Sequence, residues 1–256
     1  MQKYKFKNGH TTLIEYIKPD TQKTQNFTIV YAHGFCSDPM GRKPEMVKKW
    51  CIEHGVGFFR FEIAGHGSDI ERFEETTIDT YREQMFEIVS EIVDGDVVVM
   101  GASLGGWLSL LSAVRFPNKV KGFIGMAAAP DFLKRFFINY FNEEHKKILD
   151  EHGKIVFPTN DFSYVITKKM LESAEPNLLL EKENIPFDGK VRLIQGMKDA
   201  ALPWEIAPHI AKKLTSNDVK VVLMKESNHR LSSDEDIAEM YKMLDDFLAK
   251  FFNVRC

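Results

Sequence analysis

Short apolar runs alternate with longer amphipathic stretches along most of this chain. The apolar runs have the length of buried strands, are rich in Val, Ile and Phe, and occupy residues 27–32, 57–63, 96–100, 120–126, 190–195 and 219–224. Stretches with apolar residues at helical spacing lie between most of them, and one begins at Thr77, a residue type suited to a helix N-cap. Strands that alternate with helices predict a parallel sheet covered by helices on both faces.

The two ends of the chain extend this pattern. Strand-like segments at residues 3–7 and 12–17 flank Asn8-Gly9, a hairpin turn signal. The last amphipathic stretch opens with Ser233-Asp234-Glu235-Asp236, which resembles a capping box. We therefore expect one α/β domain over residues 1–256, built on an eight-stranded, mostly parallel sheet.

One stretch breaks the rhythm. Residues 131–189 separate two apolar runs, where an ordinary crossover needs a dozen or two residues. We expect a small helical lid inserted at about residues 131–189. Its aromatic residues either pack the lid onto the body or line an apolar pocket, and they are Phe132, Phe136, Phe137, Tyr140, Phe141, Phe157, Phe162 and Tyr164.

Composition narrows the function classes. The 256 residues carry a net charge of −3, too small and mixed to indicate a nucleic-acid partner. The chain contains no run of 18 apolar residues, so the sequence predicts no membrane span. The first residues lack the apolar segment of a secretory signal. Three scattered cysteines fit neither a disulfide framework nor a zinc site. We expect a cytoplasmic monomer without metal or cofactor.

The chemistry starts at residues 101–105, which read Gly-Ala-Ser-Leu-Gly between an apolar run and a helix-like run at 107–114. This strand–turn–helix context is that of a nucleophile elbow, with Ser103 at the tip of a sharp turn. Side chains two residues to either side of the serine would collide, which explains Gly101 and Gly105. The pattern alone also fits a glycine-rich turn of a nucleotide-binding fold.

A serine nucleophile needs a general base, and the base needs an orienting acid. In a parallel sheet the site lies at the carboxyl ends of the strands, and the chain order to look for is Ser, acid, His. His229 lies just past the run at 219–224, and Asp199 follows the run at 190–195. Asp131 is a rival acid because it also follows a strand.

Catalysis at a serine also needs donors for the oxyanion of the intermediate. The backbone N–H groups of Leu104 and Phe35 are the candidates, because one follows the nucleophile and the other lies in the loop after the run at 27–32. Gly34 lets this loop turn, and we expect His33 to hold it.

Two further residues beside these motifs receive structural interpretations. His66, between two glycines, is expected to fix a tight turn rather than to transfer protons. Cys36 is expected to be a small buried hydrophobe, with an oxidisable thiol at the rim of the site as the alternative.

Together these motifs resemble a known family. They stand in the order of α/β-hydrolase-fold serine hydrolases and comprise His33-Gly34-Phe35, Gly65-His66-Gly67, the serine motif followed by Gly106-Trp107, Gly196-Met197-Lys198-Asp199 with Pro203-Trp204, and Asn228-His229-Arg230-Leu231. The chain is similar to the small-lid branch that includes a mitochondrial acyl-protein thioesterase, also described as an acyl-glucuronide esterase, and its bacterial relatives. The resemblance implies an α/β-hydrolase fold, with Ser103 as nucleophile, Asp199 as acid and His229 as base.

The function expected from the residues and the resemblance is hydrolysis of a small-molecule carboxylic ester or thioester through a serine acyl-enzyme. Two alternatives stay open. The first is a serine exopeptidase on the same fold, because one scaffold and triad host many substrates. The second is a binding module that has kept the fold without catalysis. The sequence does not identify the natural acyl or leaving group.

Overall fold

An eight-stranded sheet organises the molecule, and the computed structural model describes residues 1–22, 26–135, 141–158 and 163–251. In sheet order the strands are β1 (Gln2–Lys5), β2 (Thr11–Ile17), β4 (Gly57–Phe61), β3 (Phe27–Ala32), β5 (Asp96–Ala102), β6 (Val120–Met126), β9 (Lys190–Gly196) and β10 (Val219–Met224). From β4 to β10 neighbouring strands are parallel, whereas β1 and β2 are antiparallel to their neighbours. The eight-stranded, mostly parallel sheet predicted from the sequence is confirmed.

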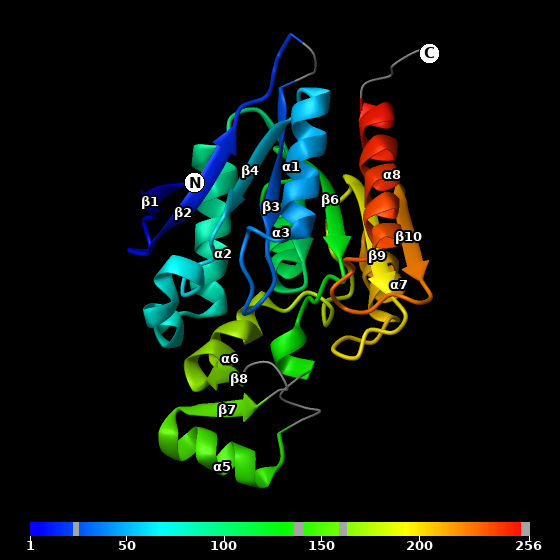
Figure 1. The fold of residues 1–256 in the computed structure, drawn as a ribbon. Coiled ribbons are helices and arrows are strands. Elements are labelled where there is room, and N and C mark those ends of the chain that lie inside the picture. Colours follow the sequence, from blue (N-terminus) through cyan, green and yellow to red (C-terminus); the bar gives the residue numbers. More distant parts are fainter. Residues whose placement is uncertain (23–25, 136–140, 159–162, 252–256) are drawn as a thin grey trace.

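Helices cover both faces of this sheet, as Figure 1 shows. The helices α1 (Arg42–His54) and α8 (Asp234–Phe251) pack on one face, and α2 (Ile78–Glu87), α3 (Leu104–Arg115) and α7 (Ile206–Lys213) on the other. Strand residues alternate between the two cores: Phe27, Ile29 and Tyr31 face α1 and α8, while Val30 and Ala32 face the other layer. Burial on both faces explains why most positions of these strands are apolar.

Two helix starts predicted from the sequence form caps. The Thr77 side chain accepts a hydrogen bond from the Thr80 backbone N–H, and the Thr80 side chain accepts one from Thr77 N–H. The Ser233 hydroxyl accepts from Asp236 N–H at 3.1 Å, and Asp236 accepts from Ser233 N–H at 2.9 Å. Each pair satisfies donors that a first helical turn leaves free. No helix among the described residues is long and apolar enough to cross a membrane.

The segment between β6 and β9 lies beyond the ends of the strands, at the bottom of Figure 1. It holds α5 (Glu143–His152), β7 (Lys154–Pro158), β8 (Ser163–Thr167), α6 (Lys168–Ala174) and the short 3-10 helix η3 (Glu175–Asn177). The antiparallel pair β7–β8 is an addition to the helical segment expected from the sequence. Its physical reason is the β-branched and aromatic content of Ile155-Val156-Phe157 and Tyr164-Val165-Ile166, which favours strands.

Candidate active site

Ser103 lies in the turn between β5 and α3 and has φ +51°, a strained value for a residue with a side chain. A Cβ at Gly101 would come 2.1 Å from the Gly105 carbonyl oxygen, and a Cβ at Gly105 would come 2.1 Å from the Ala32 carbonyl oxygen. Both positions therefore require glycine. The helix α3 starts at Leu104, directly after the serine, so its free N–H groups lie beside Ser103.

Asp199 and His229 meet at the carboxyl ends of β9 and β10. The His229 Nδ1–H donates to Asp199 Oδ2 at 2.7 Å. The other carboxylate oxygen, Oδ1, accepts from the backbone N–H groups of Ala201 at 2.9 Å and Leu202 at 2.8 Å. Because the carboxylate fixes the proton on Nδ1, the second imidazole nitrogen keeps its lone pair.

Burial and hydrogen bonding act in opposite directions on the Asp199 carboxyl. Desolvation raises its pKa, but hydrogen bonds, together with the positive charge that His229 carries when protonated, outweigh that effect and lower the pKa below its usual value. Gln195 contributes to this lowering, because its Nε2–H donates to Asp199 Oδ2 at 2.8 Å. The carboxylate stays ionised at neutral pH and able to orient the imidazole.

The rival acid, Asp131, is engaged elsewhere. Its carboxylate accepts from the backbone N–H groups of Leu179 and Leu180 at 2.7–3.1 Å, and burial raises its pKa. These bonds join the first residue of the inserted segment to a point just after η3. Asp131 therefore closes the base of the segment, and Asp199 is the carboxylate that contacts His229.

The loop after β3 approaches Ser103 from the neighbouring strand. A Cβ at Gly34 would lie 3.4 Å from Ser103 Cβ, so the loop passes directly over the serine. His33 fastens this loop: its Nδ1–H donates to the Gly34 carbonyl at 2.8 Å, and its Nε2 accepts from Ile63 N–H at 2.9 Å. Burial lowers the pKa of His33 to about 3, so the imidazole is neutral. Among the described residues, the N–H of Phe35 meets no acceptor.

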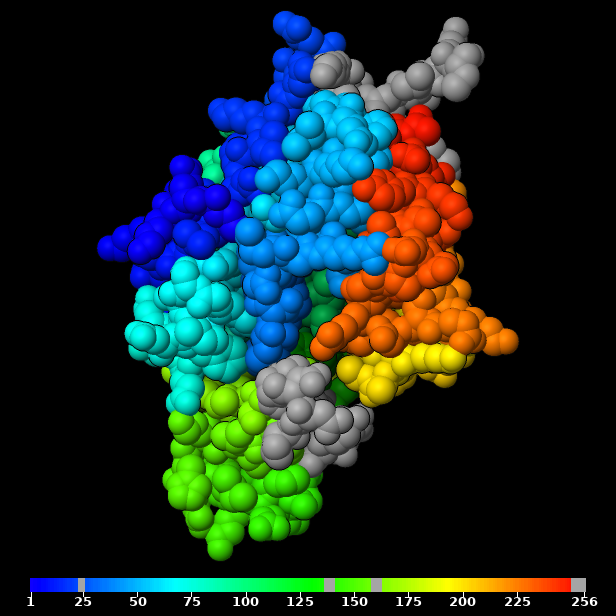
Figure 2. All heavy atoms as spheres, in the orientation of Figure 1, coloured from blue at the N-terminus to red at the C-terminus, as the bar shows by residue number. Residues whose placement is uncertain are grey.

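Ser103 and His229 both line a cavity of about 570 Å³. Figure 2 shows the hollow between the blue segment before α1 and the orange segment before α8. Its lining includes the apolar side chains of Phe35, Ile166 and Leu202. The lining also includes Arg42, Lys43 and Arg230, of which Arg42 forms an ion pair with Asp234 and Lys43 donates to the Arg230 carbonyl.

The aromatic residues of the inserted segment divide between both predicted roles. Phe132 and Tyr164 line the cavity, and both rings lie against that of Phe35, with centroids at 5.6 and 5.8 Å. Phe141 and Phe157 instead pack on each other at 5.1 Å within the segment. Phe136, Phe137, Tyr140 and Phe162 lie outside the described residues.

One expectation for a cavity residue is wrong. Cys36 is not a small buried hydrophobe: its side chain is exposed at the cavity wall. The reason is the positive φ of Cys36, +52°, which turns the loop outwards after Phe35. Partial desolvation raises the pKa of its thiol to about 11, so the thiol stays protonated.

Sequence reasoning missed Gln195, which donates to Asp199. It is fully buried near the end of β9, and its signal is an amide directly after the apolar pair Leu193-Ile194, four residues before the acid. Within the part of the chain that the structure describes, no group of three or more His, Cys, Asp or Glu residues could hold a metal ion.

Comparisons with known proteins agree with this fold. Residues 89–255 match the sequence model of the prolyl oligopeptidase family. The structure of mouse α/β hydrolase domain-containing protein 10 superimposes with a TM-score of 0.85 at 28% identity, over 98% of both chains. A putative hydrolase from Agrobacterium vitis has the same fold, with a TM-score of 0.87 over 97% of both chains, at 22% identity. These likenesses define a class of enzyme, the serine hydrolases of the α/β-hydrolase fold.

Curated relatives narrow that class. The mitochondrial palmitoyl-protein thioesterase ABHD10 of Bos taurus is 30% identical, over 96% of this chain and 83% of its own length. The Homo sapiens enzyme is 32% identical, over 88% of this chain and 74% of its own. The chain belongs to the family of α/β hydrolases that the prolyl oligopeptidase model and the ABHD10 thioesterases represent, and it is a serine ester or thioester hydrolase.

The same relatives correct the location expected from the sequence. The ABHD10 enzymes of five mammals are all named mitochondrial, so the expectation of a cytoplasmic location is wrong. That expectation rested on signals the sequence does not show, and a missing signal carries little information about compartment.

Proposed function

We propose that the chain hydrolyses acyl esters or thioesters through a covalent acyl-enzyme on Ser103, with His229 as general base and Asp199 as the orienting acid. The observation that carries this proposal is the 2.7 Å bond from His229 Nδ1–H to Asp199, formed beside Ser103 at one cavity. With Nδ1 donating to the carboxylate, Nε2 is free to take the serine proton and later to return it to the leaving group.

The oxyanion of the tetrahedral intermediate is held by two backbone donors in this proposal. The N–H of Leu104 is the first of α3, where the helix dipole also favours negative charge. The N–H of Phe35 comes from the loop that passes over Ser103. Both donors are backbone groups, held by the start of α3 and by the loop that His33 fastens, so in this proposal the site is organised before the substrate binds.

In this proposal the acyl group lies against the apolar lining residues Phe132, Tyr164 and Ile166. Two of these side chains come from β8 and one from the start of the inserted segment, so this segment acts as a lid over the acyl site. The ABHD10 relatives are named palmitoyl-protein thioesterases. A long acyl chain is compatible with these apolar and aromatic lining residues.

A substrate panel tests the proposal. Hydrolysis of p-nitrophenyl esters from acetate to palmitate, with palmitoyl-CoA beside them, should depend on Ser103 and vanish in Ser103→Ala. Aminoacyl anilides belong in the panel because the chain matches the prolyl oligopeptidase family. Turnover of the anilides alone would contradict the esterase assignment and support the exopeptidase. Absence of any Ser103-dependent turnover would support the non-catalytic binding module.

A further inference from the structure

The turn after β4 lies against the loop that passes over Ser103. Gly65 and Gly67 have φ values of +71° and +53°, and a Cβ at Gly65 would come 2.7 Å from Thr76. These two glycines let the chain reverse sharply, and the reversal aims the His66 ring at the loop after β3. The tight turn expected from the sequence is present.

The His66 ring bridges its own turn and the neighbouring loop. Its Nδ1 lies 3.0 Å from the Ala64 carbonyl oxygen, and its Nε2 lies 3.1 Å from the Cys36 backbone nitrogen. A carbonyl only accepts, so the proton is on Nδ1 and Nε2 accepts from Cys36 N–H. Burial lowers the pKa of His66, so the ring stays neutral and keeps this acceptor.

Cys36 needs such support. Its φ of +52° is unfavourable for any residue with a Cβ, at about 1–2 kcal/mol. The Cys36 N–H belongs to the peptide that links it to Phe35, so a bond to this N–H also orients the Phe35 backbone. The N–H of Phe35 is the oxyanion donor proposed above.

Ring packing fixes the orientation of His66. Its imidazole meets the rings of Phe35, Phe73, Tyr81 and His33 edge to face, with centroids 5.3–5.8 Å away. The His66 side chain is 1% exposed. With rings on several sides, the imidazole has little freedom to rotate away from Cys36.

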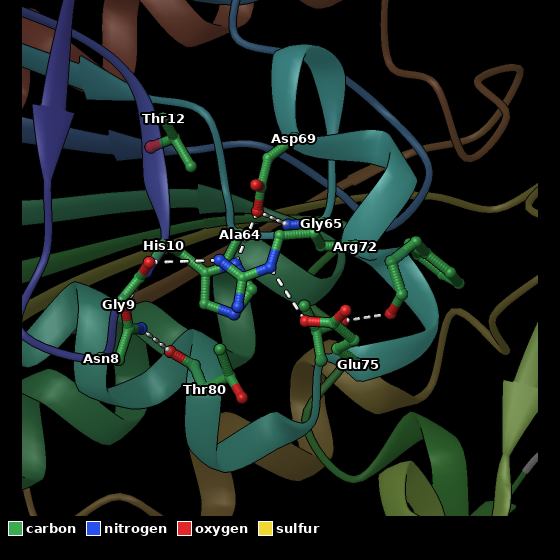
Figure 3. Close-up of polar contacts among 12 residues, drawn as sticks. Asn8, Gly9, His10, Thr12, Ala64, Gly65, Asp69, Arg72, Glu75 and Thr80 are labelled. Carbon is green, nitrogen blue, oxygen red and sulfur yellow. Dashed lines mark hydrogen bonds and ion pairs between the residues drawn. The ribbon is translucent and has the colours of Figure 1, made fainter.

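The turn is itself fastened from behind, as Figure 3 shows. Asp69 Oδ2 accepts from Gly65 N–H at 2.8 Å and contacts His10 Nδ1 at 2.6 Å. His10 directly precedes β2, so a continuous set of bonds runs from the N-terminal hairpin through Asp69 and Gly65 to His66 and Cys36.

We propose that His66 is a positioning residue for the oxyanion site: by accepting the Cys36 N–H, it holds the Phe35–Cys36 backbone in the conformation that aims Phe35 N–H at the substrate oxygen. This inference rests on the proposed function, because it assumes an oxyanion formed at Ser103. It assigns to the Gly-His-Gly turn a role in the transition state in addition to its role in the fold.

The test compares variants of His66 that differ in where they offer an acceptor. His66→Gln places an oxygen near the position of Nε2, whereas His66→Asn can replace only the contact to Ala64, and His66→Leu replaces neither. Loss of the Cys36 contact should lower kcat by about 10- to 100-fold, somewhat less than deleting an oxyanion donor outright. The KM for p-nitrophenyl butyrate should change by less than about three-fold, since the bond acts on the transition state. His66→Gln should recover most of kcat.

His10→Leu is the matched control, because it makes the same chemical change at a second buried histidine that supports the same turn without touching Cys36. It should lower the melting temperature and leave kcat within about three-fold of the parent. A trifluoromethyl ketone, which forms an oxyanion on the serine, should lose affinity in His66→Asn in proportion to kcat/KM.

A suppressor gives a second readout. Glycine adopts positive φ without strain, so adding Cys36→Gly to His66→Asn should restore part of the lost kcat. Equal losses of kcat in the Gln and Asn variants and His10→Leu, in step with their melting temperatures, would reduce His66 to a purely structural residue. The same conclusion would follow if His66→Asn had the same kcat and the same affinity for the ketone as the parent protein.

Ser103→Ala is measured in parallel. Full activity of Ser103→Ala would overturn the proposed function, whereas an inactive Ser103→Ala beside a fully active His66→Asn would overturn this inference alone.

Discussion

At the scale of single residues, two aspartates that follow strands have separate tasks. Asp199 orients His229, and Asp131 accepts backbone N–H groups at the base of the inserted segment. Asp199→Asn should lower kcat by about 100- to 10,000-fold, because an amide stabilises the wrong imidazole tautomer and no imidazolium. Asp131→Asn should leave kcat nearly unchanged and lower the free energy of unfolding, because an amide has one acceptor oxygen in place of two. Steady-state kinetics and urea unfolding of both variants measure this, and a larger kcat loss in Asp131→Asn would exchange the assignments.

His33 makes stability depend on pH. Its folded pKa of about 3 lies below the ordinary value of 6.5, so the unfolded chain binds the extra proton first as the pH falls. The stabilisation that neutral His33 provides is fully present above pH 6.5 and is lost progressively towards pH 3. Lowering the pH from 7 to 5 should therefore reduce the free energy of unfolding by about 2 kcal/mol, at about 1.4 kcal/mol per pH unit below the unfolded pKa.

His33→Gln isolates this contribution, because glutamine keeps an acceptor for Ile63 N–H but does not titrate. Urea unfolding at both pH values should therefore show a smaller loss in the variant than in the parent. An equal loss in both proteins would show that His33 is not the group that titrates.

At the scale of elements, the elbow requires glycine at the start of α3. A Cβ at Gly105 would overlap the Ala32 carbonyl, which belongs to a buried strand and cannot move aside. Gly105→Ala should lower the free energy of unfolding by more than about 3 kcal/mol or prevent folding, through overpacking and backbone shift. Gly153→Ala is the control: no atom lies within 4 Å of a Cβ there, and only its φ of +70° opposes the change, at about 1 kcal/mol. Comparable unfolding curves for the two variants would contradict this account of the elbow.

The elements that sequence reasoning predicts best are those whose signals are local. The cap at Thr77 and the alternation of strands and helices need only neighbouring residues to be recognised. The sequence predicts a helix from residue 107, whereas α3 begins at Leu104. The predicted start is too late because Gly105 and Gly106 resemble helix breakers along the sequence. Their reason is tertiary: Gly105 faces Ala32 and Gly106 faces Ala128 at distances that exclude a side chain.

Contacts between distant segments explain what the sequence could not predict. The motifs identify Ser103, Asp199 and His229 as candidates, but they do not show that Asp131 bonds to Leu179 and Leu180, 48 and 49 residues later. Likewise, Gly-His-Gly indicates a turn, while the bond from Cys36 N–H to His66 spans 30 residues and depends on how two loops meet. Such pairings are set by the sheet order, which no local pattern contains.

At the scale of the whole molecule, the loops at the ends of the strands carry the proposed reacting groups, and the inserted segment supplies part of the cavity lining. Phe132→Ala should lower kcat/KM for p-nitrophenyl octanoate by about 10-fold relative to acetate, because a long acyl chain loses apolar contact area that a short one never uses. Phe157→Ala makes the same change in a ring that packs on Phe141, and it should reduce stability without altering chain-length preference. Equal shifts in preference would place the acyl chain elsewhere.

The central claim is that Ser103 carries the acyl group during turnover, and mass spectrometry of the quenched enzyme tests it most directly. After mixing with p-nitrophenyl acetate and acid quenching within the first turnovers, the peptide that contains Ser103 should carry an acetyl group. The His229→Ala variant, expected to react slowly, serves as the control. Ser103→Ala should carry no adduct on this peptide. Turnover without an adduct on Ser103, or an acetyl group on the Cys36 thiol in its place, would contradict the account.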